Sequence, residues 1–558
     1  MHFNWTLPDE NLNCIEQFLK SRNLDKPTLD CDSTLLPDEN LLKDIDKACN
    51  RILKAIKDNE KIIVFGHDDL DGITSCYLIF DFLTSAGSIN HYYYLPNRAV
   101  DRHGLCQNLI DFAVAYEAKL IISVDNGISS VKEVADLVDL DIDTIILDHH
   151  IPTDELPSAY AVVNPKQSDC QYPEKMLAGV GVCFFIVKKL CQLIDLDFKE
   201  IWYFWTAVGT IADKVPLQGV NRYFVKYVLN NFYFFLEDFT LKFVYNQQKK
   251  YIYSPSKMGY INYLIRILYN GRDLNGKNKS FQFIISTQFE KEVLFIELNE
   301  IREQNDTLIK QNLQSLDELF LTELKKIWRK LPSKYELKDK YCNEIEEDVF
   351  VFTKDSKPLL LVVIDKKHNF AYSLLGIHAS YLYNELKIPV IMIKPKDSEH
   401  FVAEARGPKW FNLVECFNYC QDAFTQYGGH VKAAGFLIEN SNITLFKQKL
   451  KSFINEKDFT LPELQTMINI DAIFKNFNKQ EIDCFYERLE PFGQGFAEPV
   501  ILIKNYSYRD EDKYYFYGLT DEVISGGLWD LVVIINEHRN FRVKDYKKNI
   551  LGVTNEGR

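Results

Sequence analysis

The chain has 558 residues, of which 46% are hydrophobic and 26% are charged, and its formal net charge is −14. This length exceeds what one hydrophobic core supports, and the acidic balance argues against a protein that coats nucleic acid nonspecifically. No apolar stretch is long enough to cross a membrane, and the first residues lack the features of a secretory leader. The 12 cysteines include no CxxC pair. We therefore expect a cytoplasmic protein with reduced thiols.

The first chemical motif follows the apolar run Ile62 to Phe65, which has the length and β-branched content of a buried strand. Three metal-capable side chains come next, His67, Asp69 and Asp71, before a helix predicted over Ile73 to Leu83. Residues two apart in an extended segment point the same way, so these three can face one point. Burying an imidazole with two carboxylates is unfavourable unless a cation joins them. For this stretch taken alone, a polar loop is the alternative.

Two further predicted strands end in side chains of the same kind. The run Leu120 to Val124 leads into Asp125, and the run Thr144 to Leu147 leads into the triplet Asp148-His149-His150. With a helix predicted between them, this βαβ rhythm indicates a parallel sheet, whose ligands gather beyond the carboxyl ends of its strands. We therefore expect the three motifs to converge on one metal site. Carboxylates with one or two imidazoles suit Mn²⁺ or Mg²⁺ better than zinc.

Asp213 lies just beyond a helix predicted over Ile201 to Ile211, in an otherwise apolar neighbourhood. We expect it to be a further metal-site carboxylate, with an ordinary helix cap as the alternative. Arg98 lies in a loop after the strand predicted near His91. A phosphate contact and a solvated turn explain this arginine equally well.

The later part of the chain contains a basic stretch and a second α/β unit. Lys325 to Lys340 is basic with interleaved aromatic residues, and a solvated linker explains it better than a nucleic-acid track does. Strands are predicted over Leu359 to Ile364 and Pro389 to Ile393, followed by Arg406 and then by Gly428-Gly429-His430. Paired glycines permit close approach to a phosphate chain, with a tight turn as the alternative. Short β-rich runs with clustered basic residues near the end predict a barrel that binds a strand.

Several stretches together resemble the DHH phosphoesterase superfamily, and more closely its RecJ-type single-strand exonucleases. The triplet Asp148-His149-His150 is the one that names the superfamily. Seven further stretches occur in the family's order: Leu95–Leu105, Val124–Ser129, Leu156–Lys166, Leu177–Val182, Val208–Asp213, Gly428–Phe436 and Leu489–Pro499. The similarity extends over most of the chain from about residue 40 to about residue 505.

The resemblance implies a fold of five parts. A helical segment at 1–58 precedes a parallel-sheet DHH catalytic domain at 59–225 and a helical connector at 226–345. A second α/β lobe of the DHHA1 type follows at 346–457, and an OB-like β-barrel follows at 458–558.

The resemblance also implies 5′-to-3′ hydrolysis of single-stranded DNA to nucleoside monophosphates, in DNA repair and recombination, with two divalent ions. One ion would be held by His67, Asp69 and Asp125, and the other by Asp71, Asp125, His149 and Asp213. His150 would contact the scissile phosphate, and Asp148 would orient a histidine without being a metal ligand itself. The nucleic-acid contacts would come from Arg98, Arg272, Arg302, Arg406, Gly428, Gly429 and His430. We expect a monomer without a membrane partner, which acts on single-stranded DNA or RNA beside a single-strand binding protein or helicase.

Two departures from the RecJ pattern bear on the substrate. His67 stands where RecJ-type enzymes usually carry aspartate, and Glu404 adds negative charge to the phosphate loop that contains Arg406. Both favour the alternative of a phosphodiesterase for short oligoribonucleotides or dinucleotides. A non-catalytic single-strand-binding scaffold is a second alternative, although every expected ligand position carries a competent residue.

Overall fold

The computed structural model divides into two compact units, one formed by Met1–Arg302 with Thr466–Arg558 and the other by Glu303–Gln465. The residues that it describes are 4–97, 100–101, 104–153, 155–250, 256–269, 271–272, 277–316, 342–346, 349–354, 357–365, 375–386, 388–408, 410–459, 467–536 and 539–548. Among these residues, no helix is both long enough and apolar enough to cross a membrane. The five domain boundaries inferred from the sequence stay predictions.

A five-stranded parallel sheet lies at the centre of the first unit, in the order β3-β2-β4-β5-β6. Its strands are β2 (Ile62–Gly66), β3 (His91–Tyr94), β4 (Leu120–Val124), β5 (Asp143–Leu147) and β6 (Ala161–Val163). The predicted α/β fold with a parallel sheet is confirmed, and the three predicted strands that lead into the metal motifs are β2, β4 and β5.

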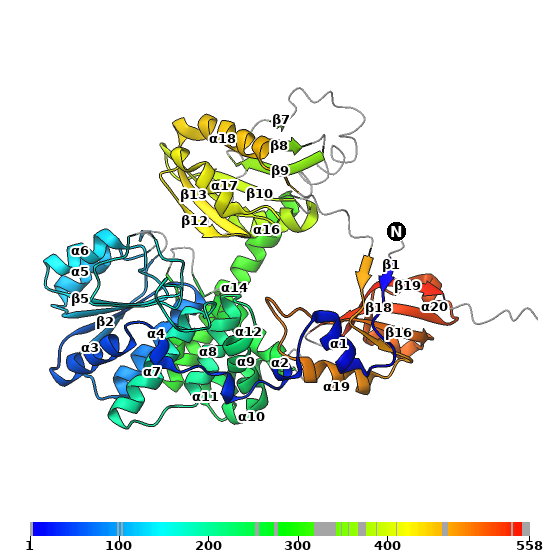
Figure 1. Ribbon diagram of the computed structural model, residues 1–558, viewed down its shortest axis with the longest axis horizontal. Coiled ribbons are helices and arrows are strands. Elements are labelled where there is room, and N and C mark those ends of the chain that lie inside the picture. The colour runs from blue at the N-terminus through cyan, green and yellow to red at the C-terminus, as the bar shows by residue number, and fades with distance from the viewer. Residues whose placement is uncertain are drawn as a thin grey trace, which may run out of the picture. The chain divides into compact units, whose positions relative to one another are not determined.

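Helices cover both faces of this sheet. Successive residues of a strand point to opposite faces, and here the residues on both faces are apolar. Ile62 and Val64 belong to one core, together with residues of α3 (Ile45–Lys57), α4 (Leu70–Ser85) and α7 (Gly179–Ile194). Ile63 and Phe65 belong to another core, together with residues of α5 (Gln107–Ala115) and α6 (Val131–Asp139). Figure 1 shows α5 and α6 on one side of the strands and α3 and α7 on the other. A sheet covered in this way leaves the carboxyl ends of its strands as the place for polar chemistry.

A group of helices continues the first unit beyond the sheet. They are α8 (Ile201–Ala212), α9 (Gly219–Asn230), α10 (Phe232–Phe235), α11 (Phe239–Lys249), α12 (Lys257–Tyr269), α13 (Ser280–Ile285) and α14 (Gln288–Leu316). α4, the helix that carries Asp71, packs against both α7 and α8. Because α7 and α8 are largely buried, they are apolar around most of their circumference.

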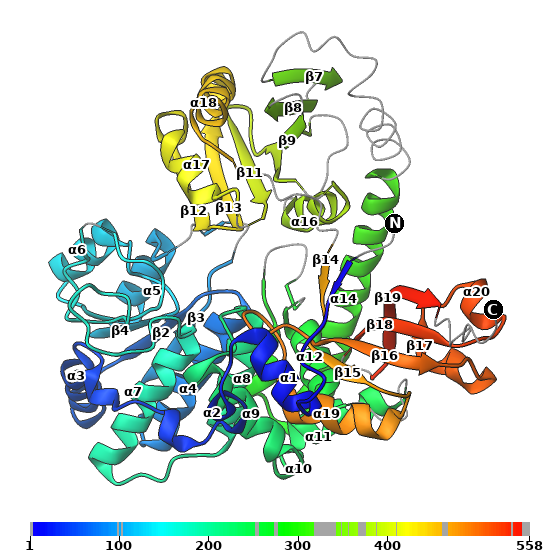
Figure 2. The same ribbon diagram turned by 45° about the vertical axis from the view of Figure 1, so that its right-hand side comes forward.

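The C-terminal segment forms a mixed sheet of five strands in the order β15-β16-β18-β19-β17. The segment contains β14 (Met467–Asn469), β15 (Ala472–Phe474), α19 (Lys479–Leu489), β16 (Val500–Tyr506), β17 (Phe516–Tyr517), α20 (Asp521–Ile524), β18 (Trp529–Ile535) and β19 (Phe541–Lys548). Within the described part of the chain, β15 and β17 form the two edges and do not pair, so the sheet is open and the predicted closed barrel is not confirmed. Figure 2 shows these strands side by side.

The N-terminal segment packs on this C-terminal sheet and is not purely helical, in contrast to the prediction. It contains α1 (Cys14–Arg22) and α2 (Lys26–Asp30), but it begins with β1 (Asn4–Thr6). β1 pairs in parallel with β14, and Arg22 forms an ion pair with Asp471 at 2.6 Å. Such pairing between distant segments leaves no local periodic signal in a three-residue strand.

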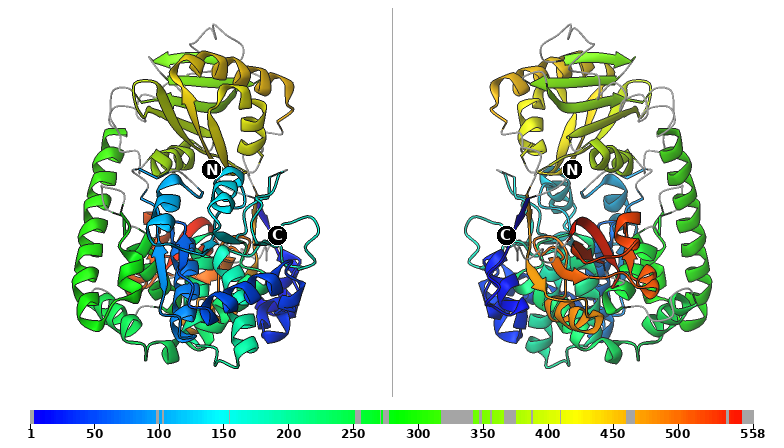
Figure 3. Two further views of the ribbon diagram at one scale, coloured as in Figure 1. Left: turned by 90° about the vertical axis from the view of Figure 1, so that its left-hand side faces the viewer. Right: turned by 90° about the vertical axis from the view of Figure 1, so that its right-hand side faces the viewer.

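The second unit contains a sheet in the order β12-β13-β11-β10-β9-β8-β7. Its elements are β7 (Cys342–Glu346), β8 (Val349–Lys354), β9 (Lys357–Ile364), α16 (Leu375–Leu386), β10 (Val390–Pro395), β11 (His400–Arg406), α17 (Leu413–Tyr419), β12 (Gln426–His430), β13 (Ala433–Glu439) and α18 (Ile443–Glu456). Residues of α17 and α18 fill the core on one face, and residues of α16 fill the core on the other. Figure 3 shows the ribbon of this unit from two opposite sides.

Candidate metal centre

The predicted metal ligands follow the carboxyl ends of neighbouring strands. His67 comes directly after β2, Asp125 directly after β4, and His149 one residue beyond Asp148, which follows β5. Because β2, β4 and β5 are adjacent in the sheet, these chain ends lie side by side. Asp213 reaches the same place from the end of α8. The fold thus gathers side chains from four separate segments at one edge of the sheet.

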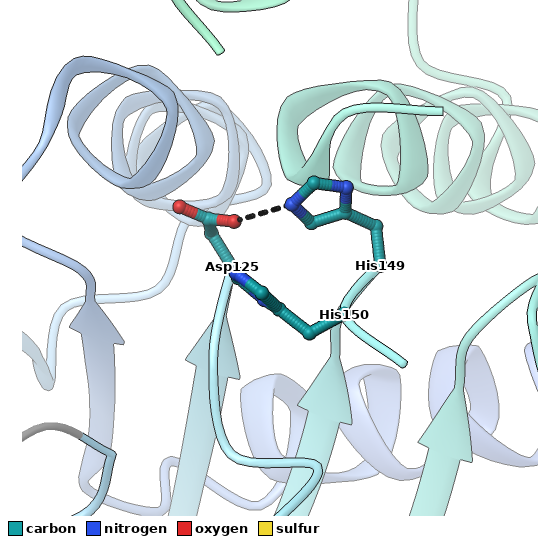
Figure 4. Close-up of side chains that lie close together, drawn as sticks. All are labelled: Asp125, His149 and His150. Carbon is teal, nitrogen blue, oxygen red and sulfur yellow. Dashed lines mark ion pairs between the residues drawn. The ribbon is translucent and has the colours of Figure 1, made fainter. Parts of the chain in front are cut away.

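Among the described residues, two groups of predicted ligands place their ligand atoms within 4.8 Å of one another, His67 with Asp69 and Asp125, and Asp71 with His149 and Asp213. A third group, Asp125 with His149 and His150, meets the same distance. The carboxylate of Asp125 lies between the first two groups. Its Oδ2 is 3.8 Å from Nδ1 of His67. Its Oδ1 is 3.2 Å from Nε2 of His149, the contact marked by the dashed line in Figure 4. All six ligands proposed from the sequence are therefore brought together, with Asp125 in a bridging position.

The carboxylate of Asp71 is fixed by the N-terminus of α7. Its two oxygens accept hydrogen bonds from the N–H groups of Gly179 and Val180, at 2.7 and 2.8 Å. These donors belong to the first turn of α7, where free N–H groups and the helix dipole favour an anion. The stretch Leu177–Val182 (LAGVGV), which has no assigned role in the sequence analysis, supplies these donors and so positions a proposed ligand.

The imidazole of His149 presents a lone pair to the centre. Its Nδ1 lies 2.8 Å from the carbonyl oxygen of Leu177, which can only accept, so Nδ1–H is the donor and Nε2 carries no proton. Burial lowers the pKa of His149 to about 3 and keeps the ring neutral. The Nε2 lone pair then faces Oδ1 of Asp125, and both atoms are buried without a hydrogen bond among the described residues. Two facing electron-pair donors suit a shared cation.

The acids of the centre are difficult to ionise in the absence of a cation. Burial, and then the charge of Asp69, raise the pKa of Asp71 to about 7. Burial and the charges of Asp71 and Asp69 raise the pKa of Asp213 to about 8. The same causes raise the pKa of Asp125 well above its usual range. The donor set is thus oxygen-rich and electrostatically unsatisfied, and the residues present fit divalent cations such as Mn²⁺ or Mg²⁺.

These shifts predict that the metal-free protein loses stability as the pH rises. The folded pKa values of Asp71 and Asp213, about 7 and about 8, lie above the ordinary value of 3.8, so the folded state binds more protons than the unfolded state across that range. His150, whose folded pKa is about 9, acts in the same direction above its ordinary 6.5, whereas His149 opposes it only below 6.5. In EDTA, the melting temperature should therefore fall between pH 6.5 and pH 8.

Thermal denaturation followed by fluorescence checks this prediction, with and without Mn²⁺. A bound cation takes the place of the protons, so the rise in melting temperature on adding Mn²⁺ should be larger at the alkaline end of the range. The substitution Asp213→Asn should flatten the decline in EDTA. A melting temperature in EDTA that stays constant over this range would contradict the assigned shifts.

Asp148 fixes the orientation of the His150 ring. Its Oδ1 is 2.7 Å from Nδ1 of His150 and accepts the N–H of His149 at 2.7 Å, while its Oδ2 accepts the N–H of Ile128 at 3.0 Å. Burial opposes ionisation of Asp148, but the charge and hydrogen bond of His150 outweigh it and hold its pKa well below the usual range. For His150, burial is likewise outweighed by the charge of Asp148, and its pKa rises to about 9. The pair is a fixed carboxylate beside a charged imidazole.

The sequence did not predict the backbone conformation of Asp125 or its close neighbour. Its φ of 58° lies in the left-handed region, and its N–H donates to the carbonyl oxygen of Leu147 at 2.8 Å. Aspartate tolerates this region better than most residues do. A Cβ atom on Gly179 would lie 2.7 Å from both the Cβ and the Oδ1 of Asp125, so only glycine fits there. Gly179, the first glycine of the stretch Leu177–Val182, was the signal in the sequence for this close approach.

Arg272, proposed as a nucleic-acid contact, is held at the edge of the centre by an acid. Its guanidinium forms an ion pair with the buried carboxylate of Asp68 and donates to the carbonyl oxygen of Asp68 at 3.2 Å. Asn278 donates to the same carbonyl oxygen at 3.0 Å. Since Asp68 lies between two proposed ligands, these contacts position the loop that carries His67 and Asp69.

Of the other proposed nucleic-acid contacts, one lies on α14, four lie in the second unit, and one lies outside the described residues. Arg98 and the stretch Lys325 to Lys340 are not among the described residues. Arg302 lies on α14 and is half-buried. In the second unit, Arg406 on β11 forms an ion pair with Glu404 at 2.9 Å, while Gly428, Gly429 and His430 belong to the edge strand β12.

Comparisons with known proteins agree with this architecture. Residues 61–203 match the DHH family, N-terminal domain. The chain is 27% identical over 481 residues to the single-stranded-DNA-specific exonuclease RecJ of Bacillus subtilis, which covers 85% of this chain and 55% of the relative. It is 38% identical to RecJ of Escherichia coli over 201 residues, or 32% of this chain and 33% of the relative. The chain thus spans about half or less of the length of these relatives.

A solved structure resembles the whole chain. RecJ of Thermus thermophilus, crystallised in complex with Mn²⁺, superimposes with a TM-score of 0.70 and 20% sequence identity. The match covers 98% of this chain and 80% of that structure. This likeness extends to both units and supports the fold.

Proposed function

We propose that the protein is a metal-dependent exonuclease, because residues 61–203 match the DHH family, N-terminal domain, and RecJ homologues match most of the chain's length. Its substrate would be single-stranded DNA, hydrolysed from the 5′ end to nucleoside monophosphates. The observation that carries the proposal is the position of Asp125, whose two carboxylate oxygens face two separate groups of ligand atoms. That arrangement suits a pair of ions that act on one phosphodiester.

Mn²⁺ or Mg²⁺ would be held by His67, Asp69 and Asp125 on one side and by Asp71, Asp125, His149 and Asp213 on the other. When bound, such a pair of ions supplies Lewis-acid stabilisation of the phosphate and a hydroxide nucleophile near neutral pH. The manganese complex of Thermus thermophilus RecJ supports this choice of cation.

The protein's own residues would orient the substrate. His150 carries a positive charge at neutral pH, because Asp148 raises its pKa to about 9, and its Nδ1 is fixed by that acid. Its remaining ring nitrogen is then a donor, and a charged donor forms a strong hydrogen bond to a phosphate oxygen. Asp148 is a positioning residue in this scheme.

Single-strand binding would involve the C-terminal sheet, in place of the OB-like barrel inferred from the sequence. Tyr514 and Tyr517 are 70% and 57% exposed, and Arg542 and Lys544 are exposed on β19. Aromatic faces stack on bases, and basic side chains contact the backbone, in proteins that bind single strands. An acidic protein of this kind would act in the cytoplasm as a monomer, beside a single-strand binding protein or helicase in DNA repair and recombination.

One observation keeps a second candidate substrate class open. Glu404 engages Arg406 at 2.9 Å, so the arginine expected to meet a phosphate already has an anionic partner. A phosphodiesterase for short oligoribonucleotides or dinucleotides would use the same metal centre, but this loop would meet a different substrate.

The test is a comparison of substrates with the purified protein and Mn²⁺. Single-stranded DNA of about 30 nucleotides, longer than one strand-binding module covers, is compared with RNA of equal length, blunt duplex DNA and a dinucleotide. Both 5′-phosphate and 5′-hydroxyl ends are used. We expect release of 5′-terminal mononucleotide from the single-stranded DNA, without a strong advantage for a 5′-phosphate because of Glu404.

The outcomes separate the candidates. Cleavage of the dinucleotide or the RNA alone would replace the exonuclease with the phosphodiesterase. Strong cleavage of blunt duplex would contradict the single-strand specificity. A sample that binds Mn²⁺ and single-stranded DNA but turns over none of these substrates would be a non-catalytic scaffold.

A further inference from the structure

Lys166 lies beside the metal centre in a turn that is fixed to His150. It comes shortly after β6, and its N–H donates to Oδ1 of the fully buried Asn164 at 2.8 Å. The Nδ2 of the same Asn164 donates to the carbonyl oxygen of His150 at 2.9 Å. Gln167 ties the other end of the turn to the carbonyl oxygen of Val162 at 2.8 Å. The point from which the Lys166 side chain projects is therefore fixed relative to the triplet that includes His149 and His150.

The ammonium group of Lys166 acts on the second group of ligand atoms. Its charge stabilises the ionised form of Asp213, and it disfavours a charge on His149. In return, Asp213 and Asp148 favour the charged form of Lys166 against the burial that lowers its pKa. The lysine is half-buried, so its charge lies within reach of the centre without being fully desolvated.

Lys166 differs from the other cations at this centre because no described residue accepts a hydrogen bond from its ammonium group. His150 contacts Asp148 at 2.7 Å, and Arg272 forms an ion pair with Asp68. By contrast, Nζ of Lys166 makes no hydrogen bond and no ion pair with any residue in the described part of the chain. A half-buried ammonium group without an acceptor is unfavourable unless a ligand supplies one.

The charge balance indicates the chemistry of that ligand. Asp69, Asp71, Asp125 and Asp213 carry four negative charges when ionised, and two divalent ions would neutralise them. The charge of Lys166 would then remain uncompensated at the centre. The natural counterion is an anionic oxygen of the substrate, for which an ammonium group is a mobile point-charge donor.

We propose that Lys166 contacts a phosphate oxygen of the substrate at the metal centre, on the side of His149 and Asp213. This inference deepens the proposed function and rests on it. In this role Lys166 is a catalytic residue that stabilises the negative charge of the reacting phosphate, whereas Asn164 is a positioning residue that fixes its distance from His150.

Kinetics of three variants test the role in turnover. Lys166→Met keeps the length of the side chain and removes the charge, Lys166→Arg keeps the charge, and Lys132→Met is the matched control on an exposed position of α6. With single-stranded DNA and Mn²⁺, Lys166→Met should lower kcat/KM by about 100-fold, as removal of one charge-stabilising donor does. Lys166→Arg should recover most of that loss, and Lys132→Met should match the wild type. All three variants should still bind Mn²⁺.

A binding measurement tests the phosphate contact without turnover. In a common Asp125→Asn background, the affinity for labelled oligo-dT is measured against salt concentration by fluorescence anisotropy. Loss of one phosphate contact should reduce the slope of log K against log salt by about 0.7 for Lys166→Met, and by nothing for Lys132→Met.

The two measurements separate failure of this inference from failure of the proposed function. A wild type that cleaves DNA, with Lys166→Met equal to it in rate and in salt slope, would overturn the role of Lys166 alone. A wild type that cleaves no DNA would overturn the exonuclease, while the salt slope would still decide whether Lys166 contacts phosphate. Loss of Mn²⁺ binding in Lys166→Met that arginine does not restore would make Lys166 a structural residue.

Discussion

Replacing Asp125 with asparagine should reduce Mn²⁺-dependent release of mononucleotide by about 1,000-fold or more, because one change removes an oxygen ligand from both groups of ligand atoms. Oδ2 faces His67 and Oδ1 faces His149, so an amide at this position disables the two sides together. The measurement is the initial rate with 5′-labelled single-stranded DNA, alongside Mn²⁺ affinity by calorimetry. Binding of ions should weaken together with the rate.

The same substitution should stabilise the metal-free protein. Asp125 is buried among Asp71, Asp69 and Asp213, whose charges oppose its ionisation. An amide removes that repulsion, and its N–H can donate to Nε2 of His149, which lies 3.2 Å from Oδ1. The melting temperature in EDTA should therefore rise, while the increase caused by Mn²⁺ should shrink.

Asp139→Asn provides the control, because Asp139 is an exposed acid at the end of α6. It should leave the rate, the metal affinity and the melting temperature unchanged. If Asp125→Asn retained wild-type turnover, or lowered the melting temperature in EDTA, the bridging position of this carboxylate would have no functional meaning.

Addition of one methyl group at Gly179 should reduce turnover by about 100-fold, the scale expected when a reacting group is displaced by roughly 1 Å. The new Cβ would lie 2.7 Å from Oδ1 of Asp125, so the carboxylate has to move away from His149. The helix that supplies the donors to Asp71 begins at the same residue, so both ligands are disturbed. The assay is the rate as a function of Mn²⁺ concentration, which should show weaker metal activation as well as a lower maximum.

Gly181→Ala is the matched control, two residues further along α7. Its Cβ would find no heavy atom closer than 3.4 Å, a distance that a small shift of Leu177 relieves. It should keep most of the activity, and alanine in a helix interior should not destabilise the protein. Equal losses in the two variants would point to a general defect of α7 and contradict a specific displacement of Asp125.

Much of the first unit could be predicted from local sequence. β2, β4 and β5 are short apolar runs bounded by polar residues, and fully buried parallel strands have that composition. The side chains just beyond them are predicted to be metal ligands because carboxyl ends of adjacent parallel strands meet at one edge. Asp213 was identified as the one acid in an apolar stretch, for which burial without a cation is unfavourable.

Other features depend on contacts between segments that are distant in the sequence. The closed barrel was inferred from short β-rich runs, but the order of five strands depends on pairings such as that of β17 with β19, for which the periodicity of the chain gives no signal. The pairing of β1 with β14 is of the same kind.

Within the centre, the sequence by itself determined which side chains are proposed as ligands and which cations suit their donor atoms, because the types of donor atom fix that chemistry. Only the tertiary structure decided how they act together. The bridging orientation of Asp125, the lone pair of His149 set by Leu177, the ion pair of Arg272 with Asp68 and the effect of Asp213 and Asp148 on the charge of Lys166 all depend on neighbours in space. The type of a residue determines which ligands it can bind, and its neighbours in the fold determine whether it still needs one.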